Sequence, residues 1–402
     1  MNQSFQQFDL DPCLPGHPDP YGTYAALLQQ SAAHWCEGPQ MWIVLGHAES
    51  LELMRDPRFS RQDHLDKLIA RFGRNGHIYE RQKLDIPYMD GKQHARMRQH
   101  VIKAYHGIDL LALAEFTRRF AVDRLSRIKG DEPFDLVALL ANDLPGMVAS
   151  ELMGVPPSQQ LEVANKVSAF VRARGLTQTE QTASGGGDAL EIYGHYFLPL
   201  IQARRGGGQQ DLLSRLIDDP TEGISLSDEQ LLLIISSNFY SASVYTVRLL
   251  IGTIAWAMAS HPDTYQRVRS DRKLVAAAIE EVLRWDPPAQ ALNASTATAD
   301  LVIAGQTIKA GDSVTALVGA ANRDPRVFDQ PDQLLIDRSP NPHLSFAPGV
   351  HQCLGLHLAR MQGAVVLSVL CDQFESLHWE PSESRRLIAD RFRGFEHLIL
   401  HR

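Results

Sequence analysis

A long apolar stretch near the middle of the chain, residues 231–259, most constrains the possible folds. It contains no Asp or Glu and only one basic residue, Arg248. As one helix it would extend about 43 Å, enough to cross either a membrane or a domain. Asn238, four serines and Arg248 near its middle favour a buried helix through a core. We therefore expect a protein without a membrane span, built around this helix.

A short loop, residues 346–355 with the sequence FAPGVHQCLG, places Cys353 directly before a helical pattern. A sulfur at a helix N-terminus faces unpaired N–H groups and the positive end of the helix dipole, which favours thiolate over thiol. Gly349 and Gly355 allow a tight turn and close approach to a flat group. Such a thiolate suits a soft metal with one axial position to fill, for which haem iron is the obvious candidate; the alternative is a buried structural cysteine.

The pattern Phe346-x-x-Gly349-x-x-x-Cys353-x-Gly355 resembles the haem-ligand signature of the cytochrome P450 family, in its bacterial soluble form. The resemblance implies a mainly α fold with small β-sheets and a long central helix over a buried haem b. Cys353 would be the axial ligand of the iron. Other motifs of the family occur in order over nearly the whole chain, so we expect residues 1–402 to form a single domain.

Two basic residues, His94 and Arg98, lie four positions apart in a predicted helix and therefore share one face. The alternative for such a pair is a solvated basic helix face. The family pattern implies that both, together with His351, bind haem propionates through charge-assisted hydrogen bonds. Ser295 stands where the family usually has an arginine for a propionate, so one expected contact is missing.

The central stretch departs from the family at its most reactive position. Ala242, Ser243, Tyr245 and Thr246 stand where the family carries Ala, Gly, an acid and Thr. The resemblance implies that Thr246 lies on the oxygen-binding side of the haem. Tyr245, with an ordinary pKa of roughly 10, is a poor substitute for an acidic proton source. Protons would then come through water, through Thr246, Ser241 or Ser243, or from the substrate.

This departure keeps more than one reaction open. Oxygen insertion into a small organic substrate, in secondary metabolism, competes with radical chemistry such as ring formation, coupling or nitration, and with peroxide-driven oxidation. A haem-thiolate sensor without turnover is a further alternative. The residues expected to form the substrate pocket are Asn238, Ser241, Leu292, Asn293 and Phe392.

A second motif is expected to be structural. Glu281 and Arg284 are three residues apart on one helix face, followed at the family's distance by Arg338. A buried Glu-Arg-Arg cluster of this kind fixes geometry more than it adds stability.

The composition of the chain limits the classes of partner that it can bind. A formal net charge of −8 argues against nucleic-acid binding, and four dispersed cysteines without a Cys-x-x-Cys pair fit a reducing cytoplasm. Residues 1–7 are polar and carry no signal or anchor segment. We expect a cytoplasmic monomer that does not bind a membrane. With no flavin or nucleotide module in the sequence, the expected electron donors are a ferredoxin and an NAD(P)H-dependent ferredoxin reductase, docking near Arg96, Lys103 and Arg360.

Three local predictions bear on the elements around the site. Residues 61–88 are polar and without a strong period, which predicts an irregular loop. Residues 134–153 show a helical pattern and predict one helix. Glycine runs at 185–187 and 206–208 predict flexible joints on either side of a helix at 189–205.

Overall fold

The computed structural model describes residues 20–37, 39–72, 83–130, 132–174, 186–218, 224–387 and 391–402. Its α-helices are α1 (Tyr21–Gln30), α2 (His47–Arg55), α3 (Arg61–Phe72), α5 (Gly91–Tyr105), α6 (Leu110–Leu125), α7 (Leu144–Leu152), α8 (Pro157–Arg174), α10 (Gly186–Arg204), α11 (Leu212–Asp218), α12 (Asp228–Leu233), α13 (Ala242–Ser260), α14 (Pro262–Ser270), α15 (Leu274–Trp285), α16 (Val318–Ala321) and α17 (Leu356–Gln373). A short 3₁₀ turn, η2 (Ile86–Tyr88), and two π-helical segments, η3 (Val137–Ala141) and η4 (Ile234–Ser241), complete the helical elements.

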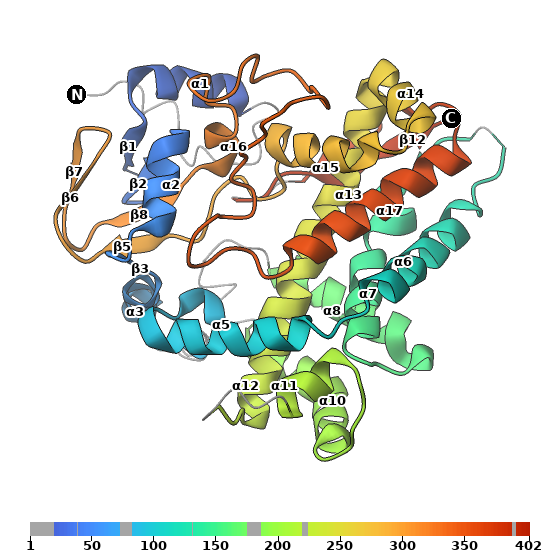
Figure 1. The fold of residues 1–402 in the computed structure, drawn as a ribbon, viewed down its shortest axis with the longest axis horizontal. Helices are drawn as coiled ribbons and strands as arrows, with labels where there is room; N and C mark the ends of the chain where they lie inside the picture. Colours follow the sequence, from blue (N-terminus) through green and yellow to red (C-terminus); the bar gives the residue numbers. More distant parts are fainter. Residues whose placement is uncertain are drawn as a thin grey trace.

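Twelve short strands form four small sheets among the described residues. They are β1 (Ala33–Cys36), β2 (Met41–Val44), β3 (Phe59–Ser60), β4 (Phe134–Asp135), β5 (Ser295–Ala297), β6 (Leu301–Ile303), β7 (Gln306–Ile308), β8 (Ser313–Ala316), β9 (His378–Trp379), β10 (Arg385–Arg386), β11 (Phe395–His397) and β12 (Ile399–His401). The largest sheet has the order β1-β2-β8-β5-β3, and β2 and β8 pair in parallel. The others have the orders β4-β12-β9, β6-β7 and β10-β11. Figure 1 shows the five-stranded sheet on one side of the molecule and α6, α7 and α17 on the other, with α13 between them.

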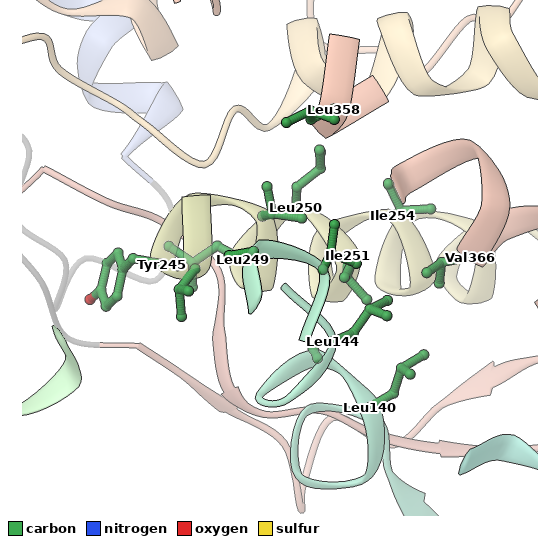
Figure 2. Close-up of a cluster of buried hydrophobic side chains, with 14 of the residues drawn as sticks. Leu140, Leu144, Tyr245, Leu249, Leu250, Ile251, Ile254, Leu358 and Val366 are labelled. Carbon is green, nitrogen blue, oxygen red and sulfur yellow. The ribbon is translucent and has the colours of Figure 1, made fainter. Parts of the chain in front are cut away.

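The apolar stretch forms the centre of the molecule, as predicted. α12, η4 and α13 follow one another without a break from Asp228 to Ser260, and 78% of its most apolar 18-residue window is buried inside the protein. Length and composition would allow this helix to cross a membrane, but its burial makes it a core helix. Leu249, Leu250, Ile251 and Ile254 project from α13 into the largest hydrophobic cluster (Figure 2).

Other helices cover α13 on several sides. Leu140 and Leu144 reach it from η3 and α7, and Leu358 and Val366 from α17 (Figure 2). These side chains are almost completely removed from water, and each such residue contributes about 1.5–3 kcal/mol of hydrophobic free energy. These contacts therefore fix the position of α13 in the core.

The helix contains a feature that its sequence did not reveal. The eight residues of η4, Ile234–Ser241, are π-helical, directly before Ala242. A π-helical segment within an α-helix widens the turn and often marks a functional site. The change of helix type thus lies just before the segment that carries Ala242, Ser243, Tyr245 and Thr246.

Two predictions from periodicity were wrong. The segment predicted to be irregular, residues 61–88, begins with the helix α3; its first turn is capped because Ser60 Oγ accepts a hydrogen bond from the N–H of Asp63 at 2.8 Å. The segment 134–153 is not one helix but β4, η3 and α7 in succession, because Phe134 and Asp135 pair with β12. In the first segment a local cap starts a helix that the polar composition concealed, and in the second the pairing with β12 outweighed the helical pattern.

The glycine runs differ from each other. Gly186 and Gly187 lie within the first turn of α10, so this part of the first run is helical rather than a joint; Gly185 lies outside the described residues. Gly206 and Gly208, after the end of α10, have φ values of +77° and +67°. These are left-handed conformations that glycine adopts at little cost, which makes the second run a turn.

A buried ionic cluster connects α15 to the chain that precedes the cysteine loop. Arg284 donates to both carboxylate oxygens of Glu281, at 2.9 and 2.8 Å, and the two side chains are 0% and 1% exposed. Arg338 Nε lies 3.2 Å from the same carboxylate. The remaining Arg284 donors reach three carbonyl oxygens, those of Asn322, Pro331 and Gln333. The structure thus brings together the Glu-Arg-Arg cluster that the sequence predicted.

We predict that Glu281→Gln lowers the free energy of unfolding by about 3–5 kcal/mol, because it leaves two buried guanidinium groups without their shared carboxylate. Urea unfolding followed by circular dichroism measures the change. Asp123→Asn is the matched control, since it neutralises the carboxylate of the exposed Asp123–Arg127 pair, and should cost less than about 1 kcal/mol. Equal effects of the two substitutions would contradict a supporting role for the cluster.

Candidate functional site

The cysteine loop is closed by its own backbone. The N–H of Cys353 donates to the carbonyl of Phe346 at 2.9 Å, and that of Gln352 donates to Gly349 at 3.1 Å. Ala347 adopts a φ of +50°, an uncommon conformation for a residue with a side chain. The chain therefore turns back on itself and delivers Cys353 two residues before Gly355, which caps α17.

The two glycines of the motif have different roles in this geometry. A Cβ on Gly349 would lie 2.2 Å from the carbonyl oxygen of Met54, so Gly349 is required for packing of the loop on α2. A Cβ on Gly355 would meet no described atom within 4 Å. Gly355 instead borders the cavity described below, and only this second glycine has the open side that close approach to a flat group requires.

Cys353 is one wall of an internal cavity with a volume of about 490 Å³. Most of the residues predicted for the site line this same cavity: Arg98, Asn238, Ser241, Ala242, Ser243, Tyr245, Thr246, Leu292, Asn293, Phe346, His351, Cys353, Gly355 and Phe392. Two predicted cofactor residues, His94 and Gly349, do not line it. The structure thus collects side chains from η4, α13, α5, the loop and both ends of the 289–293 segment around one space.

The electrostatics of the thiol differ from the expectation based on the helix end alone. Burial raises the pKa of Cys353 above its ordinary value, and this effect outweighs the hydrogen bond from the N–H of Gly355 and the nearby charges of Arg98 and Arg360. The helix end acts in the direction that we inferred, but burial has the larger effect. The helix end and the two guanidinium groups reduce the cost of forming a thiolate but do not remove it.

The hydroxyl groups on the central helix turn back to the helix itself. Thr246 Oγ1 donates to the carbonyl of Ala242 at 2.6 Å, and Ser243 Oγ donates to the carbonyl of Phe239. Each hydroxyl keeps its oxygen as an acceptor, and both residues border the cavity. Bonding to the preceding turn also loosens the helix at this point.

Tyr245, which replaces the expected acid, is packed rather than solvated. It is 5% exposed, and its ring meets that of Phe392 edge to face with 5.2 Å between the ring centres. In Figure 2 its side chain extends away from the cluster formed by Leu249, Leu250 and Ile251. Tyr245 therefore joins the central helix to the C-terminal turn that carries Phe392.

A carboxylate that sequence reasoning missed stands on the cavity wall. Asp85 is 3% exposed and accepts a hydrogen bond from Ser237 Oγ at 2.6 Å. Ser237 Oγ in turn accepts from Nδ2 of Asn238 at 3.2 Å. Residues 231–260 of the central helix contain no acid, but the π-helical segment approaches one in the 83–90 segment. The only signal in the sequence was an isolated Asp before Ile86-Pro87, a pattern that occurs in many turns.

The basic residues of the predicted propionate site lie near one another: Arg98 and His351 line the cavity, and His94 lies beside His351. Arg98 makes no hydrogen bond or ion pair within the described parts of the chain, and Nε2 of the buried His94 has no partner there either. The rings of His94 and His351 lie 4.2 Å apart, and His351 Nε2 lies 3.8 Å from Asp90. Burial, with added repulsion from His351 and Arg98, lowers the pKa of His94 to about 4, so it is a neutral donor near pH 7 rather than a cation.

The predicted docking residues are not equivalent. Arg96 is exposed and Lys103 is partly exposed. Arg360 forms a bidentate contact with Glu280, at 2.6 and 2.7 Å, and stacks over Phe346. Glu280 also accepts from His343; although burial raises its pKa, the bonds from His343 and Arg360 lower it to about 2. The charge of Arg360 is thus compensated locally, and it braces the cysteine loop.

Comparison with known proteins gives a consistent result. The family model for cytochrome P450 matches residues 201–392. The chain is 33% identical to cytochrome P450 126 of Mycobacterium tuberculosis, over 98% of this chain and 96% of the relative. It is 31% identical to the mycinamicin IV hydroxylase/epoxidase of Micromonospora griseorubida, over 85% of this chain and 83% of the relative.

A solved structure extends the comparison to the fold. The enzyme CxnD, described as a cytochrome P450 for C–S bond formation in chuangxinmycin biosynthesis, superposes with a TM-score of 0.82 at 26% identity, covering 95% of this chain and 94% of CxnD. The mainly helical fold with small sheets, and the resemblance on which it was predicted, are confirmed.

We predict that Gly349→Ala destabilises the protein by about 1–3 kcal/mol, because the added methyl group would overlap the carbonyl oxygen of Met54 and force the loop away from α2. Chemical denaturation of the two proteins measures the difference. Gly22→Ala is the control: this exposed position in α1 has open space around it, and alanine should leave stability equal or slightly higher. A Gly349→Ala protein as stable as the parent would show that the loop does not press on Met54.

Proposed function

The chain belongs to the cytochrome P450 family and is a monooxygenase of that family, and from this premise we propose that it binds haem b through Cys353 and oxidises a small organic molecule in secondary metabolism. The observation that carries the proposal is the position of Cys353 in the wall of an internal cavity, with Thr246 in the same lining. A haem with a thiolate ligand supplies an oxidant strong enough for unactivated C–H bonds.

The residues around the cavity fit such a cofactor. Arg98 is a cation with no counter-charge in the described protein, and the orphaned Nε2 of the buried His94 is a donor without an acceptor. Buried polar groups normally have partners, so this end of the cavity suits a carboxylate-bearing group. Phe346 and Gly355 would flank the flat ring, and Arg98, His94 and His351 would bind its carboxylates.

In this proposal, residues on the opposite wall handle protons and substrate. Thr246 and Ser243 would hold water through their free acceptor positions. The small side chain of Ala242 would leave room beside them. Tyr245 is too weak an acid to replace a carboxyl group at neutral pH. Asp85 is the buried carboxylate within reach of the pocket, and its bond to Ser237 links it to the central helix. Asn238, Ser241, Leu292, Asn293 and Phe392 complete a pocket that mixes polar and apolar contacts, suited to a natural product.

The electron donor follows from the same arrangement. We propose a ferredoxin with its NAD(P)H-dependent reductase, approaching Arg96 and Lys103, whose side chains reach the surface on α5. Arg360 has a smaller part than the sequence suggested, because Glu280 balances its charge. We further propose one domain over residues 1–402, acting as a cytoplasmic monomer with no membrane or nucleic-acid partner.

The second candidate is a coupling or ring-forming reaction instead of oxygen insertion. The replacement of the expected acid by Tyr245 favours it, because this position departs from the proton-delivery pattern that oxygen insertion ordinarily uses. CxnD, named for C–S bond formation, shows this type of outcome in a structural relative. Product mass separates the two: gain of one oxygen supports insertion, and loss of two hydrogens supports coupling. Nitration and peroxide-driven oxidation are further alternatives to oxygen insertion that draws on dioxygen. Of all the candidates, a haem-thiolate sensor without turnover has the least support.

The thiolate assignment predicts a spectrum. The reduced protein with carbon monoxide should show the red-shifted absorption band of thiolate-ligated haem. Cys353→Ala should abolish this band. Cys371→Ala, which changes another described cysteine that does not line the cavity, should retain it. A parent protein that is colourless, or lacks the band, would end the proposal.

The proposed part of Thr246 in proton delivery predicts an asymmetry. Thr246→Ala should reduce the dioxygen-driven turnover about 10²-fold or more, while the peroxide-driven reaction, which brings its own protons, should lose far less. Product formation under both conditions is the measurement. Thr253→Ala, on the same helix but outside the cavity lining, is the control and should affect both reactions little. Equal losses in both reactions would reject the role of Thr246.

A further inference from the structure

Two arginines that no part of the proposed mechanism uses, Arg61 and Arg391, line the same cavity as Cys353. Arg61 is the first residue of α3, in the segment that the sequence suggested to be a loop. Arg391 lies in the C-terminal segment, directly before Phe392. They approach the cavity from parts of the chain that are 330 positions apart in sequence, so their meeting is a product of the fold.

Arg61 has no bound counter-charge in the described structure. Its guanidinium takes part in no hydrogen bond or ion pair there; the carboxylate of Asp90 acts on its charge but is bonded to other groups, among them the backbone N–H of Arg61 at 3.3 Å. Asp90 accepts from Ser60 Oγ at 2.6 Å and from the N–H of Gln62 at 3.0 Å, and faces His351 at 3.8 Å. Burial lowers the pKa of Arg61 to about 10, an effect that the charge of Arg391 increases. Arg61 nevertheless remains charged at neutral pH.

Arg391 is fixed in place but only partly satisfied. Its Nη1 donates to Oδ1 of Asn293, and its carbonyl accepts from the N–H of Gln290 at 2.8 Å. Its Nε is buried and has no partner among the described atoms. An arginine that served only to hold the 290–293 segment would not need this inward-facing donor. The guanidinium therefore keeps a fork edge free for a second acceptor.

The buried ionisable group on the next turn of α3 is not an anion that could balance these arginines. His64, one turn along α3 from Arg61, is buried with Nδ1 unpartnered. Burial, followed by Arg61, Lys67 and Arg391, lowers its pKa to about 4, so it is neutral and cannot repel or attract strongly. Two like charges facing one cavity repel each other unless an anion lies between them. The arrangement is thus complementary to a carboxylate.

The location explains why an additional cation is needed here. Ser295, which stands where the family usually has a propionate-binding arginine, is the first residue of β5 and does not line the cavity. Helix α3 packs directly against β5. The charge of Arg61 also acts on both His94 and His351, the other proposed carboxylate ligands. Arg61 thus lies beside the strand where the arginine is missing and close to the groups with which it would cooperate.

We propose that Arg61 and Arg391 form a carboxylate-binding pair in the cavity, in which Arg61 replaces the arginine that Ser295 does not supply. The proposal rests on the proposed haem-binding function for its setting. The carboxylate has two possible sources, a haem propionate or an acidic group of the substrate. Both would be bound by the same charge-assisted hydrogen bonds, and they differ in what is lost when an arginine is removed.

The test uses haem-loaded protein and the substitutions Arg61→Gln and Arg391→Gln. Haem transfer to excess apomyoglobin measures propionate binding. Spectral titration with dodecanoate and with methyl dodecanoate measures binding of a carboxylate and of its neutral ester. If the source is haem, haem transfer should accelerate roughly tenfold. If the source is substrate, haem transfer should be unchanged, and dodecanoate should bind roughly tenfold more weakly while the ester is unaffected.

Arg58→Gln is the matched control, because Arg58 is exposed, lies three residues before Arg61 and is bound to Asp56. It should change none of the three measurements. The proposal is overturned if haem transfer is unchanged in both variants and dodecanoate either binds the variants as tightly as the parent or does not bind the parent. Arg61→Lys keeps the charge but not the two-pronged geometry, and should give an effect between those of the parent and Arg61→Gln.

Two further measurements separate loss of carboxylate binding from loss of folding and from loss of thiolate ligation. Circular dichroism and the thermal midpoint show whether each variant is folded, and the Arg61→Lys protein provides the comparison if Arg61→Gln is not. The carbon-monoxide spectrum of the parent reports separately on thiolate ligation. A normal spectrum with unchanged haem transfer and ligand binding rejects the arginine pair alone, whereas an absent thiolate band rejects the proposed function itself.

Discussion

The contact between Arg284 and Glu281 lies out of reach of water, and a chain of hydrogen bonds connects it to the reactive sulfur. Arg284 binds the carbonyl of Asn322, whose side chain accepts from the N–H of Leu344 at 2.7 Å and donates to Ser345 Oγ at 2.8 Å. The carbonyl of Leu344 then accepts from Ala347, at the start of the turn that ends in Cys353. Each link is directional and buried, so the loop inherits the rigidity of α15. The position of the sulfur therefore depends on a pair of charges that takes no part in the chemistry.

A segment outside the central helix supplies a carboxylate that the helix lacks beside Thr246. Residues 231–260 contain no acid, and the hydroxyls of Ser243 and Thr246, on either side of Tyr245, are bonded to the preceding turn of their own helix. The π-helical turns of η4 place Ser237 and Asn238 toward the 83–90 segment, where Asp85 is buried. A carboxylate is thus present in the pocket wall, supplied by a different segment and coupled through a serine.

The sequence could predict those features that depend on short-range patterns. The turn around Gly349, the helix after Cys353, the pairing of Glu281 with Arg284 and the burial of 231–259 all follow from local spacing and hydrophobicity. The placement of Arg61, Asp85 and Arg391 does not, because their neighbours in space are remote in sequence and their own segments carry weak patterns. Helix α3 could have been found from Ser60 and Asp63, which have the spacing of a helix start; its polar composition concealed it.

The charge balance of the cavity gives these observations a common cause. Burial raises the pKa of Cys353 and lowers those of His94 and His351, so the thiol and both imidazoles are shifted toward their neutral forms. The arginines that line the cavity, Arg61, Arg98 and Arg391, keep their charge at neutral pH. A cavity with three fixed positive charges and one thiol is therefore unfavourable by itself and becomes favourable when it receives a cation beside the sulfur and carboxylates beside the arginines. A metalloporphyrin is a flat ligand that carries both a metal cation and carboxylates. The charges that line the cavity therefore agree with the haem that the family implies.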